Sequence, residues 1–240
     1  MSSPGSRTTD VRGRLTDIWR AAADRALPLP TELELAKELG VSRSVVREAL
    51  VDLEAQGLVA RRAHQGTFPN VAALSVPFRI DQSYELTSRL EAVGFDVEVH
   101  VVAADWSSLS PQEAADLNAT AGSSCFRVVK RWLGNGRPLI TAEDVVPARR
   151  REIEFDPEYS VFDTVQQLRG EWVEWESATL APVLPDEQAR ELLDAPRRQP
   201  LLAITIVGVS LHGDRLYRAH EVHTTHGVRY GMVRRALPND

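Results

Sequence analysis

The chain has 240 residues, 43% of them apolar, a formal net charge of −6 and a single cysteine, Cys125. This length predicts one large or two modest domains, and one cysteine excludes an internal disulfide and is typical of a reducing cytoplasm. No apolar run reaches the roughly 18 residues that span a membrane. Residues 1–9 lack the apolar core of a secretion signal and are expected to be a disordered lead-in.

Two helices are predicted in the stretch that follows. Residues 11–25 carry apolar side chains on one helical side, which indicates a helix that packs behind its neighbours. Thr31 and Glu34, three residues apart, form a capping box that begins the second helix. Gly40 ends this helix because glycine readily adopts the left-handed conformation.

A third helix and a two-stranded wing come next. Ser42 caps the helix, apolar residues follow at helical spacing, and Gly57 stops it. Residues 59–62 and 66–68 are predicted to be short strands around a turn. This order is that of a winged helix-turn-helix, in which the N-terminal residues of the second motif helix enter the major groove of DNA.

Two arginines near the N-terminal end of the third helix support DNA binding. Arg43 and Arg47 lie one turn apart, and arginine offers a fork of donors that matches guanine O6 and N7 or a phosphate. An ordinary helical hairpin with solvated arginines is the alternative, but the caps, the wing and the arginine spacing agree. The full set of predicted DNA contacts is Arg43, Ser44, Arg47, Thr31, Arg62, His64, Gln65, Gly66 and Thr67.

The same stretch resembles the winged helix of GntR-family transcription regulators. The matching residues are Leu29-Pro30-Thr31-Glu32, Leu35-Ala36, Val41-Ser42-Arg43, Val46-Arg47-Glu48-Ala49-Leu50, Leu53-Glu54, Gly57-Leu58-Val59 and Gly66-Thr67-Phe68. Leu33 stands where the family usually has an arginine that contacts DNA, and His64 where it usually has glycine. The resemblance implies a DNA-binding regulator whose operator contacts differ at these two positions.

The charge distribution limits how such a domain can bind DNA. Residues 1–70 contain 10 Lys+Arg and 9 Asp+Glu, a net of +1, and the remainder contains 18 and 25, a net of −7. Each neutralised phosphate adds affinity by releasing counterions. Binding must therefore depend on a few placed arginines and on two copies acting together.

The rest of the chain predicts a second domain of strands and short helices. We expect the DNA-binding domain over residues 10–69, a linker over 70–82 and the second domain over 83–240. Helices are predicted over residues 83–93, from 110, 161–168 and 186–193, and strands over 97–106, 125–133, 138–146, 171–184, 201–211, 216–224 and 228–236. The pattern indicates an antiparallel sheet with interspersed helices, so the fold class is α+β.

Following a GntR-like winged helix, this order of elements resembles the UTRA domain of the HutC subfamily, whose fold is related to chorismate lyase. The matching residues are Leu90-Glu91-Ala92-Val93-Gly94, Arg131 with Asn135-Gly136-Arg137-Pro138, Asp144 with Pro147, Pro200-Leu201-Leu202, Gly213-Asp214, Glu221 and Arg229-Tyr230. The resemblance implies a domain that pairs two chains into a homodimer and binds a small anionic effector.

Effector contacts are implied on the hairpin around Asn135-Gly136 and on the last hairpin. Arg131 and Glu143 fit the family's arginine and carboxylate, while Leu133 replaces its usual second arginine. With a two-residue turn, Arg131 lies opposite Ile140 and Glu143 faces the other side of the sheet, unless a bulge intervenes. A surface salt bridge is the alternative role for these charges. The other candidate contacts are Glu221, Arg218, Tyr230 and Thr87.

No metal ion or cofactor is predicted. His220, His223 and His226 are three residues apart, so on a strand they alternate between faces and cannot converge on an ion. Three functions stay open: a repressor released from a palindromic operator by an effector, a constitutive DNA-binding regulator, and a chorismate-lyase-like enzyme. The sequence shows no nucleophile–base pair that would support the enzyme.

Overall fold

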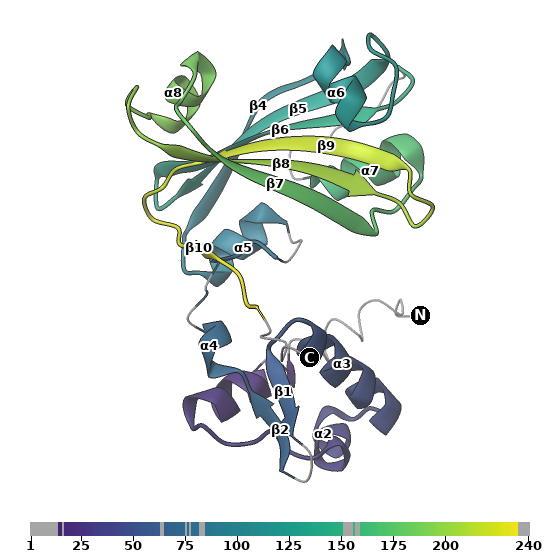
Figure 1. Cartoon of the computed structure of the whole chain (residues 1–240), viewed down its shortest axis with the longest axis vertical. Helices are drawn as coiled ribbons and strands as arrows, with labels where there is room; N and C mark the ends of the chain where they lie inside the picture. The colour runs from purple at the N-terminus through teal and green to yellow at the C-terminus, as the bar shows by residue number, and fades with distance from the viewer. Residues whose placement is uncertain are drawn as a thin grey trace, which may run out of the picture. The chain divides into compact units, whose positions relative to one another are not determined.

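The computed structural model describes residues 14–15, 17–62, 65–74, 76, 78–81, 85–150, 156 and 159–234. The chain divides into two compact units, Met1–Asp81 with Tyr230–Asp240, and Gln82–Arg229 (Figure 1). The first unit is therefore built from both ends of the chain, which passes between the units after Asp81 and again after Arg229. The predicted lead-in, residues 1–9, lies outside the described residues.

The first unit contains the winged helix-turn-helix predicted from the sequence. Its elements are a helix described over residues 14–15 and 17–24, α2 (Glu32–Leu39), α3 (Arg43–Ala55), β1 (Val59–Arg62) and β2 (Gly66–Pro69). The Thr31–Glu34 capping box is formed, Gly40 has φ 69°, and Ser42 accepts a hydrogen bond at the start of α3. The local capping signals therefore set the limits of both helices.

The helices of the first unit enclose a single apolar core. Leu15, Leu35, Val46 and Leu50 are 0–2% exposed and pack together. Burial of each such leucine stabilises the fold by roughly 1.5–3 kcal/mol. Trp19 Nε1 donates to the carbonyl of Leu58 at 2.7 Å, which ties the first helix to the start of the wing.

Within residues 228–234, the described part of the predicted strand over residues 228–236, no residue joins the large sheet, so that prediction is wrong. Instead β10 (Tyr230–Gly231) pairs in parallel with β3 (Phe78–Arg79) in the first unit. In the chain, β3 follows the short helix α4 (Val71–Leu74). Phe78 and Tyr230 form an edge-to-face pair with centroids 5.1 Å apart. A strand that follows β9 has no free edge there, because β9 is already hydrogen-bonded on both sides.

The described residues of the second unit form an antiparallel sheet and four helices, which confirms the α+β prediction. The strand order is β4-β5-β6-β9-β8-β7. The strands are β4 (Val97–Ser108), β5 (Ser124–Gly134), β6 (Arg137–Pro147), β7 (Trp175–Val183), β8 (Leu201–Val209) and β9 (Arg215–His223). The helices are α5 (Leu86–Ala92), α6 (Pro111–Asp116), α7 (Val161–Arg169) and α8 (Glu187–Leu193).

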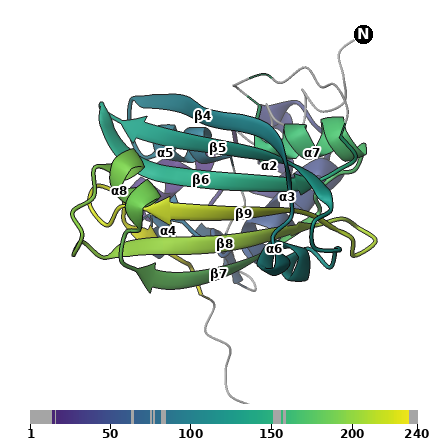
Figure 2. The same cartoon turned by 90° about the horizontal axis from the view of Figure 1, so that it is seen from above.

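The four helices cover the two faces of this sheet in pairs. α6 and α8 lie on one face and are nearest the viewer in Figure 2, and α5 and α7 lie on the other (Figure 1). We call these the α6/α8 face and the α5/α7 face. Cys125 and Val145 point to the α6/α8 face, whereas Phe126 and Ala219 pack with α7 on the other. Side chains of successive strand residues alternate between faces, so each position's face follows from the register.

A bulge fixes the register of the β5–β6 hairpin. Its turn residues Asn135 and Gly136 have φ 53° and 74°, as the Asn-Gly signal predicts. The pairing shifts between Trp132 and Leu133, so Arg131 lies opposite Thr141 rather than Ile140. The two-residue-turn register is therefore wrong beyond the bulge, and Arg131 and Glu143 share the α6/α8 face.

Candidate DNA-binding surface and effector site

The N-terminal turns of α3 present the predicted recognition residues. Val46, Leu50 and Leu53 point into the core, whereas Arg43, at the first position of the helix, and Arg47, on its flank, are exposed. Arg43 makes no hydrogen bond or ion pair with any residue that the structure describes. Its guanidinium is therefore available to a base edge or a phosphate.

Arg47 is already paired within the motif. Its Nη2 lies 3.0 Å from Glu32 Oε2, its Nε lies 3.3 Å from both carboxylate oxygens, and the arginine side chain is 63% exposed. The hydrogen bond from Arg47 lowers the pKa of Glu32 and raises the pKa of Arg47 itself. A carboxylate on α2 thus occupies the fork of donors that DNA would use.

Two predicted hydroxyl contacts serve the helix caps. Thr31 Oγ1 donates to Glu34 Oε2 at 2.8 Å and accepts from the Glu34 amide. Ser44 Oγ lies 2.8 Å from the Oγ of the cap residue Ser42. These hydroxyls stabilise the local backbone at the ends of α2 and α3, and their contact with DNA stays a prediction.

The wing supplies a third exposed arginine. The Arg62 guanidinium lies 5.2 Å from the centroid of the Phe68 ring, a cation–π contact that orients it. The Gln65 amide donates to the Arg62 carbonyl at 3.1 Å, and Gly66 has φ 104°; together they close the turn of the wing. The Thr67 carbonyl accepts a hydrogen bond from the Leu29 amide. His64 lies outside the described residues.

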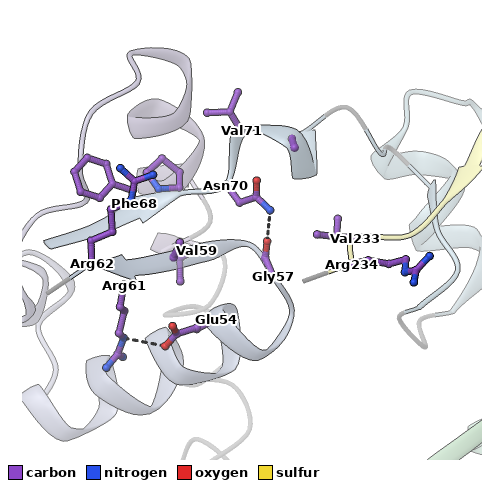
Figure 3. Close-up of a pocket in the computed structure, with 13 residues that line it drawn as sticks. Glu54, Gly57, Val59, Arg61, Arg62, Phe68, Asn70, Val71, Val233 and Arg234 are labelled. Carbon is purple, nitrogen blue, oxygen red and sulfur yellow. Dashed lines mark hydrogen bonds and ion pairs between the residues drawn. The ribbon is translucent and has the colours of Figure 1, made fainter. Parts of the chain in front are cut away.

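A cavity of about 360 Å³ opens at the base of the wing (Figure 3). Its wall includes the C-terminal end of α3, β1, α4 and the returning segment at Val233. Asn70 Nδ2 donates to the Gly57 carbonyl at 2.7 Å. Gly57 has φ 68°, and a Cβ added to it would lie 2.9 Å from Val233 Cγ1. Both the backbone conformation and the close contact therefore require glycine at this position.

In the second unit, three of the candidate effector residues lie on the α6/α8 face. These are Arg131, Glu143 and Arg218. Arg127, on the same face of β5, binds Glu113 of α6 at 2.8 Å and Glu143 at 2.7 Å. Arg218 Nε binds Asp116 Oδ2 at 2.8 Å, and Arg131 lies 3.3–3.4 Å from His100 Nδ1. The charges on this face are engaged in attaching α6 to the sheet and in contacts between strands.

The pKa of Glu113 shows how strongly this ion-pair network favours the ionised carboxylate. Burial raises its pKa, but the hydrogen bonds from Arg127 and Ser110 outweigh burial and bring the pKa down to about 2. An ion pair of this kind is a structural anchor, because removal of either partner leaves an uncompensated buried charge.

A second polar cluster lies on the α5/α7 face. It contains Lys130, Asp144, Glu221 and His223, and register places them on neighbouring strands around Ala142. Lys130 Nζ donates to the carbonyl of Tyr159, and His223 Nε2 lies 2.8 Å from Glu221 Oε2. We call these four residues the buried cluster. Of the predicted effector residues, it includes Glu221 alone.

Thr87 lies on the same face, where its Oγ1 accepts from Trp132 Nε1 at 3.1 Å across α5 and β5. Tyr230 belongs to β10 of the first unit and is not part of this sheet. Lys130, Asp144 and His223 were not among the effector contacts predicted from the sequence. Phe126, Val128 and Trp132 are apolar and occupy the same face of β5 as Lys130, two residues apart, and this periodicity could have assigned Lys130 to a core-facing position.

Known families match both units of the chain. Residues 15–68 match the bacterial regulatory proteins of the gntR family, and residues 92–228 match the UTRA domain. The chain belongs to the GntR family and carries a UTRA domain. This GntR regulator is thus a DNA-binding protein with a ligand-responsive domain.

Two curated relatives cover most of the GntR regulator. It is 23% identical over 222 residues to the HTH-type transcriptional repressor NagR of Bacillus subtilis (strain 168), covering 91% of this chain and 89% of the relative. It is 29% identical over 203 residues to the HTH-type transcriptional repressor PhnF of Mycolicibacterium smegmatis, covering 79% and 80%. The similarity therefore extends across both units of each protein.

Solved structures share the fold of the GntR regulator. The crystal structure of PhnF from Mycobacterium smegmatis has a TM-score of 0.60 at 22% identity, covering 95% of this chain and all of that one. YydK, a possible transcriptional regulator from Bacillus subtilis, has a TM-score of 0.70 at 18% identity, covering 94% and 99%.

Among the described residues, no helix is long and apolar enough to cross a membrane, and no group of three or more His, Cys, Asp or Glu is placed to hold a metal ion.

Proposed function

We propose that this GntR regulator is a cytoplasmic repressor that binds a palindromic operator as a homodimer and is released by a small-molecule effector. The observation that carries the proposal is the pair of exposed arginines, Arg43 and Arg47, on the N-terminal turns of a correctly capped α3. Arg62 on the wing adds a contact beside the groove that α3 enters. The remaining contacts proposed are Ser44, Thr31, His64, Gln65, Gly66 and Thr67.

Dimer formation is proposed through the edge strand β7. Trp175 and Leu180 on this strand are 69% and 42% exposed, and Trp172 just before it is 72% exposed. An exposed apolar edge strand with unpaired backbone groups favours association with another chain. Two copies related by a two-fold axis would present two α3 helices to the two half-sites of a palindrome.

The effector site is proposed on the α5/α7 face, at the buried cluster. On the other face, Glu143 pairs with Arg127, Arg218 pairs with Asp116, and Arg131 lies beside His100. Asp144, by contrast, has no hydrogen bond among the described residues. Glu221 and Thr87 are the predicted residues that this site retains. An effector releases DNA if it binds more tightly to a conformation in which the spacing of the two winged helices does not match the half-sites of the operator.

Selection of duplexes from a random pool with the purified chain tests this function. We expect enrichment of a palindrome whose half-sites are about 10 bp apart or a multiple of that. Enrichment of no sequence, or of a single unpaired half-site, would contradict a dimeric operator-binding protein. A thermal-shift screen distinguishes a constitutive regulator, which no small molecule stabilises, and product formation from candidate acids would indicate the chorismate-lyase-like enzyme.

A further inference from the structure

The charges around the buried cluster are mostly negative. Those that act on Asp144 are the carboxylates of Glu221, Glu143 and Glu176 and one ammonium group, that of Lys130. Lys130 in turn is influenced by Asp144 and by three further carboxylates, those of Glu85, Asp156 and Asp163. A single lysine therefore stands among several acids, of which Glu143 acts from the α6/α8 face of the sheet.

The lysine is not poised to receive an anionic ligand. Its Nζ already donates to the Tyr159 carbonyl, and burial lowers its pKa, which disfavours the charged form. Glu221 Oε2 is held by the Nε2 of His223, a fully buried side chain. An incoming carboxylate or phosphate would thus meet like charges with one engaged ammonium group to offset them.

Asp144 is the member of the cluster that lacks a donor. It makes no hydrogen bond or ion pair within the described part of the chain, although protein surrounds its carboxyl closely enough for burial to raise its pKa to about 7. Asp144 is nevertheless only half-buried and keeps part of its surface in contact with solvent. A half-buried carboxylate with no protein donor is only partly hydrated, so a ligand that supplied N–H donors would be stabilised there.

We infer that the effector is a small cation, with a protonated amine that donates to the carboxylates of Asp144 and Glu221 on the α5/α7 face. The inference rests on the proposed function, because it names the ligand class of the same site. It reverses the anionic effector that the family resemblance implies. The apolar neighbours Trp132, Ile140 and Ile204, all at most 6% exposed, line the cluster with carbon and suit a compact skeleton behind the amine.

Thermal-shift and calorimetric titration of the full chain test this ligand class. The probes are matched sets in which one carbon skeleton carries a primary amine, an alcohol, a carboxylate or a phosphate monoester, at pH 6 and pH 8. We expect amines alone to raise the melting temperature. Their affinity should be about tenfold higher at pH 8, because a group with a pKa of about 7 is mostly ionised there and mostly protonated at pH 6.

Variants identify the site. Asp144→Asn should abolish amine binding and its pH dependence, and Asp105→Asn, at an exposed carboxylate of β4 on the opposite face, should leave both unchanged. Operator binding by each variant verifies that it is folded. Stabilisation by carboxylates or phosphate monoesters, no stabilisation by any amine, or full amine binding by Asp144→Asn would each overturn the inference. An anion that releases DNA would refute the cationic class and leave the effector-controlled repressor intact, whereas failure to bind DNA refutes the repressor itself.

Discussion

Arg47, which we propose as a DNA contact, is held by Glu32, with Nη2 and Oε2 3.0 Å apart. Glu32 begins α2 and Arg47 belongs to α3, so the pair joins the two helices of the motif across the surface proposed to face DNA. DNA must therefore displace a carboxylate before Arg47 can use its full fork of donors.

Glu32→Gln should raise DNA affinity. Exposed ion pairs are worth about 0.2–1 kcal/mol, so the release of Arg47 corresponds to a gain of up to about fivefold in the dissociation constant. Fluorescence anisotropy with a labelled operator duplex measures it. Glu38→Gln, an exposed glutamate of the same helix, makes the same change in net charge and should have a smaller effect. Equal effects of the two variants would show that charge, and not the Arg47 pair, governs affinity.

Gly57→Ala should destabilise the first unit more than Gly40→Ala. The two glycines have almost the same φ, 68° and 69°, so substitution by alanine costs a similar backbone strain of about 1–2 kcal/mol at each position. A Cβ meets Val233 at Gly57 and nothing within 4 Å at Gly40. Thermal unfolding should show the larger loss for Gly57→Ala, and Val233→Ala should relieve the excess. Equal losses for the two single variants would argue against the packing of Val233 on Gly57 (Figure 3).

Glu113→Gln should lower the stability of the second unit at neutral pH. The folded pKa of Glu113, about 2, lies below its ordinary value of 4.5, so its contribution is present above pH 4.5 and is lost as the pH falls towards 2. Chemical unfolding at several pH values should show the variant and the wild type converging in that window. Glu191→Gln, at an exposed carboxylate of α8, should show no such dependence.

Leu180→Lys should separate the proposed dimer. A charge on the exposed edge strand β7 opposes association, so sedimentation should report a monomer, and operator affinity should fall because two half-sites are no longer bound together. Leu211→Lys, at a leucine that is 73% exposed in the turn between β8 and β9, serves as the control. A Leu180→Lys dimer would place the interface elsewhere.

Local signals predicted the winged helix well. The capping box at Thr31, the left-handed Gly40 and the cap at Ser42 each depend on residues within four positions, so their geometry can be read from the sequence. The same holds for the turn at Asn135, which forms as the Asn-Gly pair predicts.

Long-range pairing was harder to predict. The extra residue Leu139 shifts the β5–β6 register, and no short pattern encodes that bulge. The alternating pattern around Tyr230 indicated a strand, but its partner is Phe78, some 150 positions earlier in the chain. The buried cluster was missed for a related reason, because Lys130, Asp144 and His223 meet only after three strands are aligned.

Operator binding by the recognition helix is the central claim, and fluorescence anisotropy with the selected duplex tests it most directly. Each arginine contact to a base contributes about 1–3 kcal/mol, so the double variant Arg43→Ala with Arg47→Ala should bind about 100-fold more weakly or not at all. Arg20→Ala with Arg25→Ala, at exposed arginines near the first helix, removes the same charge and should retain most of the affinity. Unchanged affinity of the Arg43/Arg47 variant would contradict the account.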